Sequence, residues 1–295
     1  MTLAVVLVPH YTNEVFLNIT NLQWILAILI VVTLLKEPPH SKYGRVCLQI
    51  VSDSAVITCC GLTGPFIIFL TPFFIWKYFH AKSRYNFTIA LTTMMAASVQ
   101  TFFIINSLSF TLAEGKINQE LGDYAKIIGQ KLFGNLFLGM SIPYQINPVV
   151  LCGLSLFIIL FILGLSADSS NKRASLFVFM GFSLAVVLAT LAKFRANLQL
   201  LVPPGNGPRY FYLPYVMTLW SLIVCLEQKD IWKNAVAKVL LCSALMSSLT
   251  SGFRSKALTD YEWRFYSRLI GKEQNLIIPI NPEGWYVHIS RKGDQ

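Results

Sequence analysis

Charged residues are scarce in this chain. Aspartate, glutamate, lysine and arginine make up 13% of its 295 residues, whereas soluble domains carry about 25%. Hydrophobic residue types make up 55%, and the mean hydropathy is +0.57. The composition is therefore typical of a membrane protein and argues against a soluble fold.

The short motifs of nucleotide and metal chemistry are also missing. The chain has no Walker loop, GxGxxG, HExxH or DxD. Its six cysteines lie in or beside apolar stretches, with no CxxC pair and no Cys/His spacing that suits a metal. The sequence therefore assigns no certain cofactor and argues against a soluble enzyme that uses nucleotides.

Long apolar stretches separated by short basic links are present instead. Several reach the roughly 18–20 residues that a helix needs to cross about 30 Å of hydrocarbon. Continuous apolar runs suit helices, whereas a membrane barrel alternates apolar and polar residues. We therefore predict an all-α, polytopic transmembrane bundle of about seven to nine spans. The stretches are 26–35, 66–76, 87–108, 149–167, 174–192, 212–226 and 231–249.

Lysine and arginine in the links predict the orientation. Cytoplasmic links are enriched in these residues, which explains the net charge of +10 without a nucleic-acid partner. Residues 46–61 and 66–79 must then cross separately, with a turn at 62–65. The predicted cytoplasmic links are 36–45, 77–86, 168–173 and 227–233, and the predicted external segments are 10–21, 109–148, 194–209 and the tail.

Two regions outside the spans carry their own structure signals. Residues 1–250 form the predicted membrane domain, and 251–295 form an extramembrane tail. Within the external segment, 119–134 predicts an amphipathic helix with Gln130 and Lys131 on its polar face. This helix would lie in the interface plane, either as a cap on the bundle or in contact with substrate.

The tail predicts a small β-hairpin. Residues 275–280 and 285–290 are short β-like runs on either side of Asn-Pro-Glu-Gly. That tetrapeptide suits a type I turn, with proline second and glycine fourth. We expect a two-stranded sheet at the outer surface.

Arg209 is the leading candidate for ligand binding. It follows a loop rich in proline and glycine, stands at the predicted outer mouth of a span, and precedes Tyr210. A guanidinium suits phosphate because its fork contacts two oxygens together. The alternative is an arginine that reaches to the lipid headgroups beside aromatic anchors.

Three further residues complete the predicted substrate-binding set: Arg195, Asn21 and Asp260. Arg195 and Asp260 are charges expected on the outer side, where a structural role is the alternative. All three are assigned to the same external face as Arg209.

Two carboxylates are candidates for chemistry inside or near the membrane. Glu14 lies in an external segment without lysine or arginine, where it could act as a general base or hold a divalent cation. The alternative is a solvated loop acid. Asp53 lies within a predicted span, where acids are often functional. The alternative is a pair with a polar residue nearby or on a neighbouring helix.

Four short motifs suggest a family. They are Glu14 followed by Asn18-Ile-Thr-Asn-Leu-Gln-Trp24, Leu62-Thr-Gly-Pro-Phe66, Arg209-Tyr-Phe, and Ile280-Asn-Pro-Glu-Gly-Trp285. Over most of its length the chain resembles bacterial integral-membrane glycosyltransferases of the polyprenyl-phosphate-sugar type, the GT-C superfamily. The resemblance implies an external active site in the plasma (inner) membrane, a lipid-linked sugar donor, and a glycan or lipid acceptor. Membrane lipids are the other expected partners.

One departure from that family leaves the activity open. In such enzymes the usual catalytic aspartate lies in the first external loop, after the first span. Residues 1–9 are too short to span and look like the stub of a helix, so we expect this chain to correspond to the C-terminal part. The alternatives are a transporter or flippase of a lipid-linked glycan, and a non-catalytic membrane subunit.

Overall fold

A computed structural model provides the structure of the chain. It describes residues 5–6, 8, 21–37, 43–108, 121–139, 143–164, 170–195, 198, 201, 207, 209–227, 230–252, 259–270, 272–273, 275–280 and 285–290. The chain forms two compact units, Met1–Arg254 and Ser255–Gln295. We describe each unit separately.

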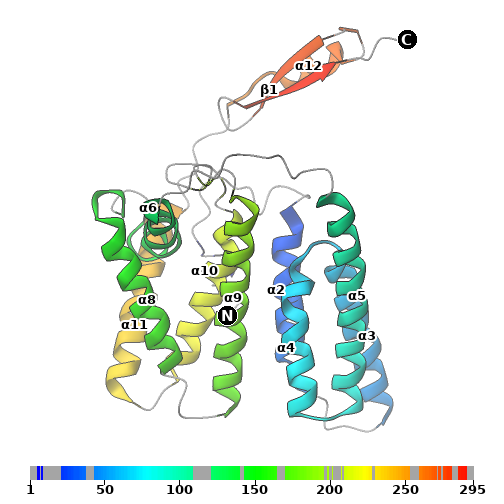
Figure 1. Cartoon of the computed structure of the whole chain (residues 1–295), viewed down its shortest axis with the longest axis vertical. Coiled ribbons are helices and arrows are strands. Elements are labelled where there is room, and N and C mark those ends of the chain that lie inside the picture. The colour runs from blue at the N-terminus through cyan, green and yellow to red at the C-terminus, as the bar shows by residue number, and fades with distance from the viewer. Residues whose placement is uncertain are drawn as a thin grey trace. The chain divides into compact units, whose positions relative to one another are not determined.

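The first unit is a bundle of helices, as the apolar stretches predict (Figure 1). Most helices run along the bundle, and a broken helix near one end lies across it. The elements are α2 (Leu22–Leu35), α3 (Tyr43–Gly61), α4 (Phe66–His80), α5 (Arg84–Leu108), α6 (Leu121–Ala125), η2 (Lys126–Gly134), α7 (Asn135–Leu138), η3 (Pro143–Gln145), α8 (Pro148–Gly164), α9 (Ser170–Lys193), α10 (Arg209–Cys225), α11 (Ile231–Ser247) and η6 (Ser248–Gly252).

Two of the described helices are long and apolar enough to cross a membrane. They comprise Arg84–Asn106 of α5 and Lys172–Lys193 of α9, with 23 and 22 residues. Shorter apolar helices occur at Leu22–Leu35, Val46–Gly61 and Phe66–His80, and at Pro148–Ile162. A helix of 14 residues such as α2 is about 21 Å long, below the roughly 30 Å of a hydrocarbon core.

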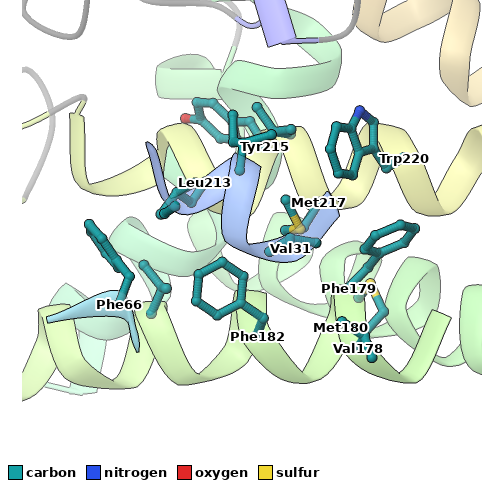
Figure 2. Packing of buried hydrophobic residues seen from close by; sticks show 14 of the residues in the cluster. Val31, Phe66, Val178, Phe179, Met180, Phe182, Leu213, Tyr215, Met217 and Trp220 are labelled. Atoms are coloured by element: carbon teal, nitrogen blue, oxygen red, sulfur yellow. The ribbon is translucent and has the colours of Figure 1, made fainter. Parts of the chain in front are cut away.

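Helix α10 lies at the centre of the bundle. Almost every residue from Phe211 to Leu222 is buried, because α10 packs against α9, α11 and α2. Figure 2 shows Phe179 of α9 against Trp220 of α10, with ring centroids 5.4 Å apart. Phe66 of α4 meets Phe182 of α9 at 6.4 Å, which joins the early helices to the later ones.

The helices alternate in direction, so the bundle has two distinct ends (Figure 1). At one end, the Lys77 ammonium donates to the Leu34 carbonyl oxygen at 2.6 Å and so ties α4 to the end of α2. At the same end, Lys172 of α9 pairs with Glu227, which follows α10, at 3.0 Å. We call this the basic end, because the predicted cytoplasmic links join their helices here. The opposite end, where α9 finishes and α10 begins, is called the Tyr210 end.

The turn at 62–65 separates two helices, as predicted. α3 ends at Gly61 and α4 begins at Phe66. Most packing of these two helices is with α2 and α5, which join them along their length. Gly64 lies against α2, since a Cβ on it would be 2.4 Å from the Gln23 side-chain oxygen. The turn therefore belongs to the Tyr210 end.

The segment predicted as an amphipathic helix over 119–134 differs from that expectation. The described part is helical from Leu121 to Leu138 with a π-helical middle, η2. Gln130 and Lys131, expected on a polar outer face, are buried at 7% and 5% exposure. The expected polar face is therefore wrong at Gln130 and Lys131, whereas Lys126, which the pattern also places off the apolar face, is 41% exposed at its side chain. The segment packs on the bundle, as the cap alternative expects, because α8 and α11 cover it: Ser243 and Ser247 of α11 donate to its last carbonyl oxygens, at 2.6 and 2.9 Å.

The second unit contains α12 (Trp263–Leu269) and a hairpin of β1 (Asn275–Ile280) and β2 (Trp285–Ser290). The strands are antiparallel, with Ile278 opposite Val287. Both strands confirm the ranges predicted from the sequence. The predicted turn, 281–284, lies outside the described residues.

Candidate functional site

Two cations meet at one phenolic oxygen at the Tyr210 end. The Lys193 ammonium, from the end of α9, donates to the Tyr210 hydroxyl at 3.2 Å. The Arg209 guanidinium, from the start of α10, donates to the same oxygen at 3.5 Å. Both groups also lie over the Tyr210 ring, 5.1 and 5.2 Å from its centroid. We call Lys193, Arg209 and Tyr210 the Tyr210 cluster.

The Tyr210 ring is fixed by two aromatic neighbours, one on α2 and one in the turn that follows α9. Trp24 of α2 meets it edge-on at 5.5 Å, and Phe194 meets it at 5.0 Å. Trp24 also contacts Phe66, which follows the 62–65 turn, at 4.6 Å. Edge-to-face pairs of this kind stabilise a defined ring orientation. The cations are therefore held against the bundle and not directed away from it.

The loop before Arg209 is shaped by glycine. Gly207 has φ +97°, in the left-handed region that other residues rarely adopt. Its Cα also lies close to Tyr210, since a Cβ there would be 3.0 Å from the ring. The Tyr210 amide donates back to the Gly207 carbonyl oxygen at 3.2 Å. Gly207 thus helps to set the start of α10.

Electrostatics at the cluster favour a negative group. Burial alone would raise the pKa of the Tyr210 phenol, but hydrogen bonds from Arg209 and Lys193 and their charges lower it below its ordinary value. Within the described part of the chain, no carboxylate forms an ion pair with Lys193. An anion would therefore gain from a positive charge that is not already neutralised by an acid.

The buried indole of Trp24 adds an unused donor beside the cluster. Trp24 is 5% exposed, and its Nε1 has no hydrogen-bond acceptor among the described residues. A buried donor without an acceptor costs free energy comparable to a lost hydrogen bond. Among the described residues, the indole N–H is thus a donor that an added acceptor could satisfy.

Lys131 of η2 contacts Leu201 and Phe211, which lie on either side of Arg209 in the sequence. The Lys131 ammonium donates to the Leu201 carbonyl oxygen at 3.1 Å and lies 5.6 Å from the Phe211 ring. Tyr215 donates its hydroxyl to the Lys131 carbonyl oxygen at 2.5 Å. This part of η2 therefore supports the first turns of α10 from one side.

The other predicted site residues are distributed differently. Asn21 is buried at the start of α2, three residues before Trp24, and Arg195 is exposed two residues after Lys193. Both lie at the Tyr210 end. Asp260 belongs to the second unit, where its carboxylate accepts the Glu262 amide at 2.9 Å. Glu14 lies outside the described residues.

Asp53 has protein partners, as one of the two sequence interpretations expects. It is 2% exposed, and its carboxylate accepts hydrogen bonds from Lys36 at 2.6 Å and Tyr85 at 2.7 Å. These partners come from the end of α2 and the start of α5. Asp53 therefore joins three helices at the basic end, and this arrangement explains its burial without a ligand.

Sequence reasoning missed two members of the site. Lys193 is the last residue of an apolar helix, where a lysine signals a helix end more often than a ligand. Trp24 is the last residue of the motif Asn18–Trp24, but its contact with Tyr210 depends on the packing of α2 against α10. One signal in the sequence could have identified Lys193 and Trp24: both lie where a predicted span meets the predicted outer side.

Metal ligands do not gather in the described residues, which hold no group of three His, Cys, Asp or Glu side chains suited to an ion. No protein-family model, curated protein or solved structure matches this chain. The resemblance to lipid-linked-sugar glycosyltransferases therefore stays a prediction from short motifs.

Proposed function

We propose that this chain is a multi-pass protein of the plasma membrane that binds a lipid-linked phosphate at the Tyr210 cluster. The donor is a polyprenyl-phosphate sugar, and the chain acts in glycosyl transfer of the GT-C type at the external face. The convergence of Lys193 and Arg209 on Tyr210 carries this proposal. Two cations within reach of one point are suited to a phosphate with two or more charged oxygens.

Membrane insertion is supported by the apolar surface of the bundle. The apolar part of α5 is only 28% buried within the bundle. Large apolar side chains cover its outer faces and those of α8, where water contact would be unfavourable. Lipid chains would cover them at no such cost. The exposed apolar side chains are Phe87, Leu91, Met95, Phe102, Phe103 and Ile105 on α5, and Val149, Leu154, Phe157 and Leu160 on α8.

The chemistry of glycosyl transfer gives each group a role. In the transfer, the acceptor hydroxyl oxygen bonds to the anomeric carbon of the sugar as the bond from that carbon to the lipid phosphate breaks. The proton of the acceptor hydroxyl passes to a base, and the lipid phosphate leaves with the bonding electrons. Negative charge grows on the departing phosphate, so Arg209 and Lys193 would stabilise it where water is excluded. Glu14 is our candidate base for the acceptor hydroxyl.

The proposal is tested by binding of a polyprenyl-phosphate sugar to purified protein. We expect Arg209→Lys to weaken binding by about tenfold, because an ammonium keeps the charge but loses the bidentate fork. Arg209→Ala and Lys193→Gln should weaken binding more than Arg209→Lys does, by up to about 100-fold relative to wild type. Affinity is measured by titration in uncharged detergent.

The matched control is Lys172→Gln, which removes one positive charge at the basic end. We expect this variant to bind like wild type, and all variants to keep the wild-type unfolding temperature. Equal affinities for wild type, Arg209→Ala and Lys193→Gln would reject the donor site and leave Arg209 as an anchor.

A further inference from the structure

A second basic site lies at the other end of the bundle, in a pocket between α4 and α5. The pocket has a volume of about 570 Å³ and is lined by Tyr78, Lys82, Ser83, Arg84, Phe87 and Thr88. Its residues come from the last turn of α4, the short link, and the first turn of α5. It opens on the surface near the basic end.

The charges in this pocket are available for a ligand. Within the described residues, neither Lys82 nor Arg84 forms an ion pair with a carboxylate. Asp53 of α3, a buried acid that bonds to the start of α5, already accepts hydrogen bonds from Lys36 and Tyr85. Lys82 and Arg84 are both exposed and lie two residues apart, so their like charges repel each other, and an anion between them would relieve that repulsion.

The turn that carries both cations is fixed by its own hydrogen bonds. The Ser83 hydroxyl accepts the Asn86 amide at 3.1 Å, and the Asn86 side chain donates to the Ala81 carbonyl oxygen at 2.6 Å. Because Ser83 immediately precedes α5, the positive end of the helix dipole lies at the same place. The backbone positions of Lys82 and Arg84 are thus set by the fold.

An apolar stripe continues from the pocket along α5. Tyr78 and Phe87 form one wall, with ring centroids 5.5 Å apart. Phe87, Leu91 and Met95 then follow at four-residue spacing and are all exposed, so they share one face of the helix. A ligand with a charged head and a long apolar chain would fit this order of groups.

We propose that the pocket binds the phosphate of an anionic phospholipid, with Lys82 and Arg84 on the phosphate oxygens and an acyl chain along the α5 stripe. Basic pockets on the cytoplasmic side of helix bundles suit such headgroups. The proposal rests on the membrane insertion proposed above, but not on glycosyl transfer. It assigns a site that is separate from the Tyr210 cluster, at the opposite end of the bundle.

The test compares phosphatidylglycerol with phosphatidylcholine of matched chains, by native mass spectrometry of the whole chain in uncharged detergent. Wild type should bind one phosphatidylglycerol about tenfold or more tightly than phosphatidylcholine. The double variant Lys82→Gln/Arg84→Gln should lose about 30-fold in phosphatidylglycerol affinity and keep its phosphatidylcholine affinity. Phe87→Ser should also weaken phosphatidylglycerol binding.

The control is Lys172→Gln/Lys233→Gln, which removes the same charge at the same end but outside the pocket. If the control binds phosphatidylglycerol as tightly as wild type, the pocket assignment is supported. If it loses as much phosphatidylglycerol affinity as Lys82→Gln/Arg84→Gln, general surface charge explains the binding and the pocket assignment is overturned. Inorganic phosphate at millimolar concentration distinguishes the source: displacement of the lipid by free phosphate would overturn the lipid assignment. Unchanged binding of a polyprenyl-phosphate sugar to the pocket variant would show that the two sites are independent.

Discussion

At the scale of single residues, the buried polar groups Asp53 and Trp24 differ in whether the described residues supply a hydrogen-bond partner. Asp53 has two protein partners and ties α2, α3 and α5 together. The Nε1 of Trp24 has no acceptor among the described residues, beside two cations. The first arrangement is structural, whereas the second supports a ligand at the Tyr210 end.

Asp53→Ala should lower the free energy of unfolding by about 2–4 kcal/mol, because Tyr85 and Lys36 would lose a buried acceptor. Lys36 is 46% exposed at its side chain, so water compensates part of the loss. Glu227→Ala is the matched control, since its side chain is 69% exposed and it pairs with Lys172 at the surface. That control should cost about 1 kcal/mol or less.

The free energy of unfolding of both variants is measured in mixed micelles. Equal losses for Asp53→Ala and Glu227→Ala would show that Asp53 contributes no more than a surface ion pair.

The residues of the site were only partly predictable from the sequence. Arg209 and Tyr210 were identified because a Pro/Gly loop, an arginine and aromatics are contiguous in the chain. Lys193 and Trp24 are 17 and 186 residues from Tyr210, so no local pattern connects them. Their meeting depends on how α2, α9 and α10 pack.

At the scale of elements, the segment from α6 to α7 shows how closely this bundle is packed. A Cβ on Gly129 of η2 would lie 2.5 Å from the Pro148 carbonyl oxygen and 2.7 Å from the Cys152 amide nitrogen, both backbone atoms of α8. Backbone atoms cannot move aside as a flexible side chain can. Gly129 therefore permits the close approach of η2 and α8.

Gly129→Ala should destabilise the protein by about 1–3 kcal/mol, because it forces the two helices apart. Gly122→Ala is the control on α6, since nothing lies within 4 Å of its Cβ position. That control should be neutral or stabilising by up to about 1 kcal/mol, because alanine favours helix.

If this packing is correct, thermal unfolding gives a lower Tm for Gly129→Ala than for wild type, and an equal or higher Tm for Gly122→Ala. A Gly129→Ala protein as stable as Gly122→Ala would contradict the close contact between η2 and α8.

Element positions were more predictable than element environments. The strands at 275–280 and 285–290 and the break at 62–65 follow from turn residues and local alternation, so the sequence located them. The burial of Lys131 could not be read from its helix, because it depends on the packing of η2 against α8 and α10 and on a hydrogen bond to the Leu201 carbonyl oxygen. A π-helical stretch such as η2 also has no distinct sequence signature, since it arises from tertiary packing.

At the scale of the whole molecule, the bundle has two ends that carry different groups of polar residues. The basic end carries Lys36, Lys77, Lys172 and the pocket at Lys82 and Arg84. The Tyr210 end carries the cluster proposed to bind a lipid-linked phosphate. If lipid surrounds the bundle, these ends face opposite sides of the membrane.

Accessibility of introduced cysteines in intact cells tests this central claim most directly. In a background without the six native cysteines, Gly122→Cys and Ala192→Cys report on the Tyr210 end, and Lys82→Cys and Ser170→Cys report on the basic end. A thiol reagent that cannot cross membranes should label the first two in intact cells, and the last two only after permeabilisation. Labelling of Lys82→Cys or Ser170→Cys from outside, at the same rate as Ala192→Cys, would contradict the account.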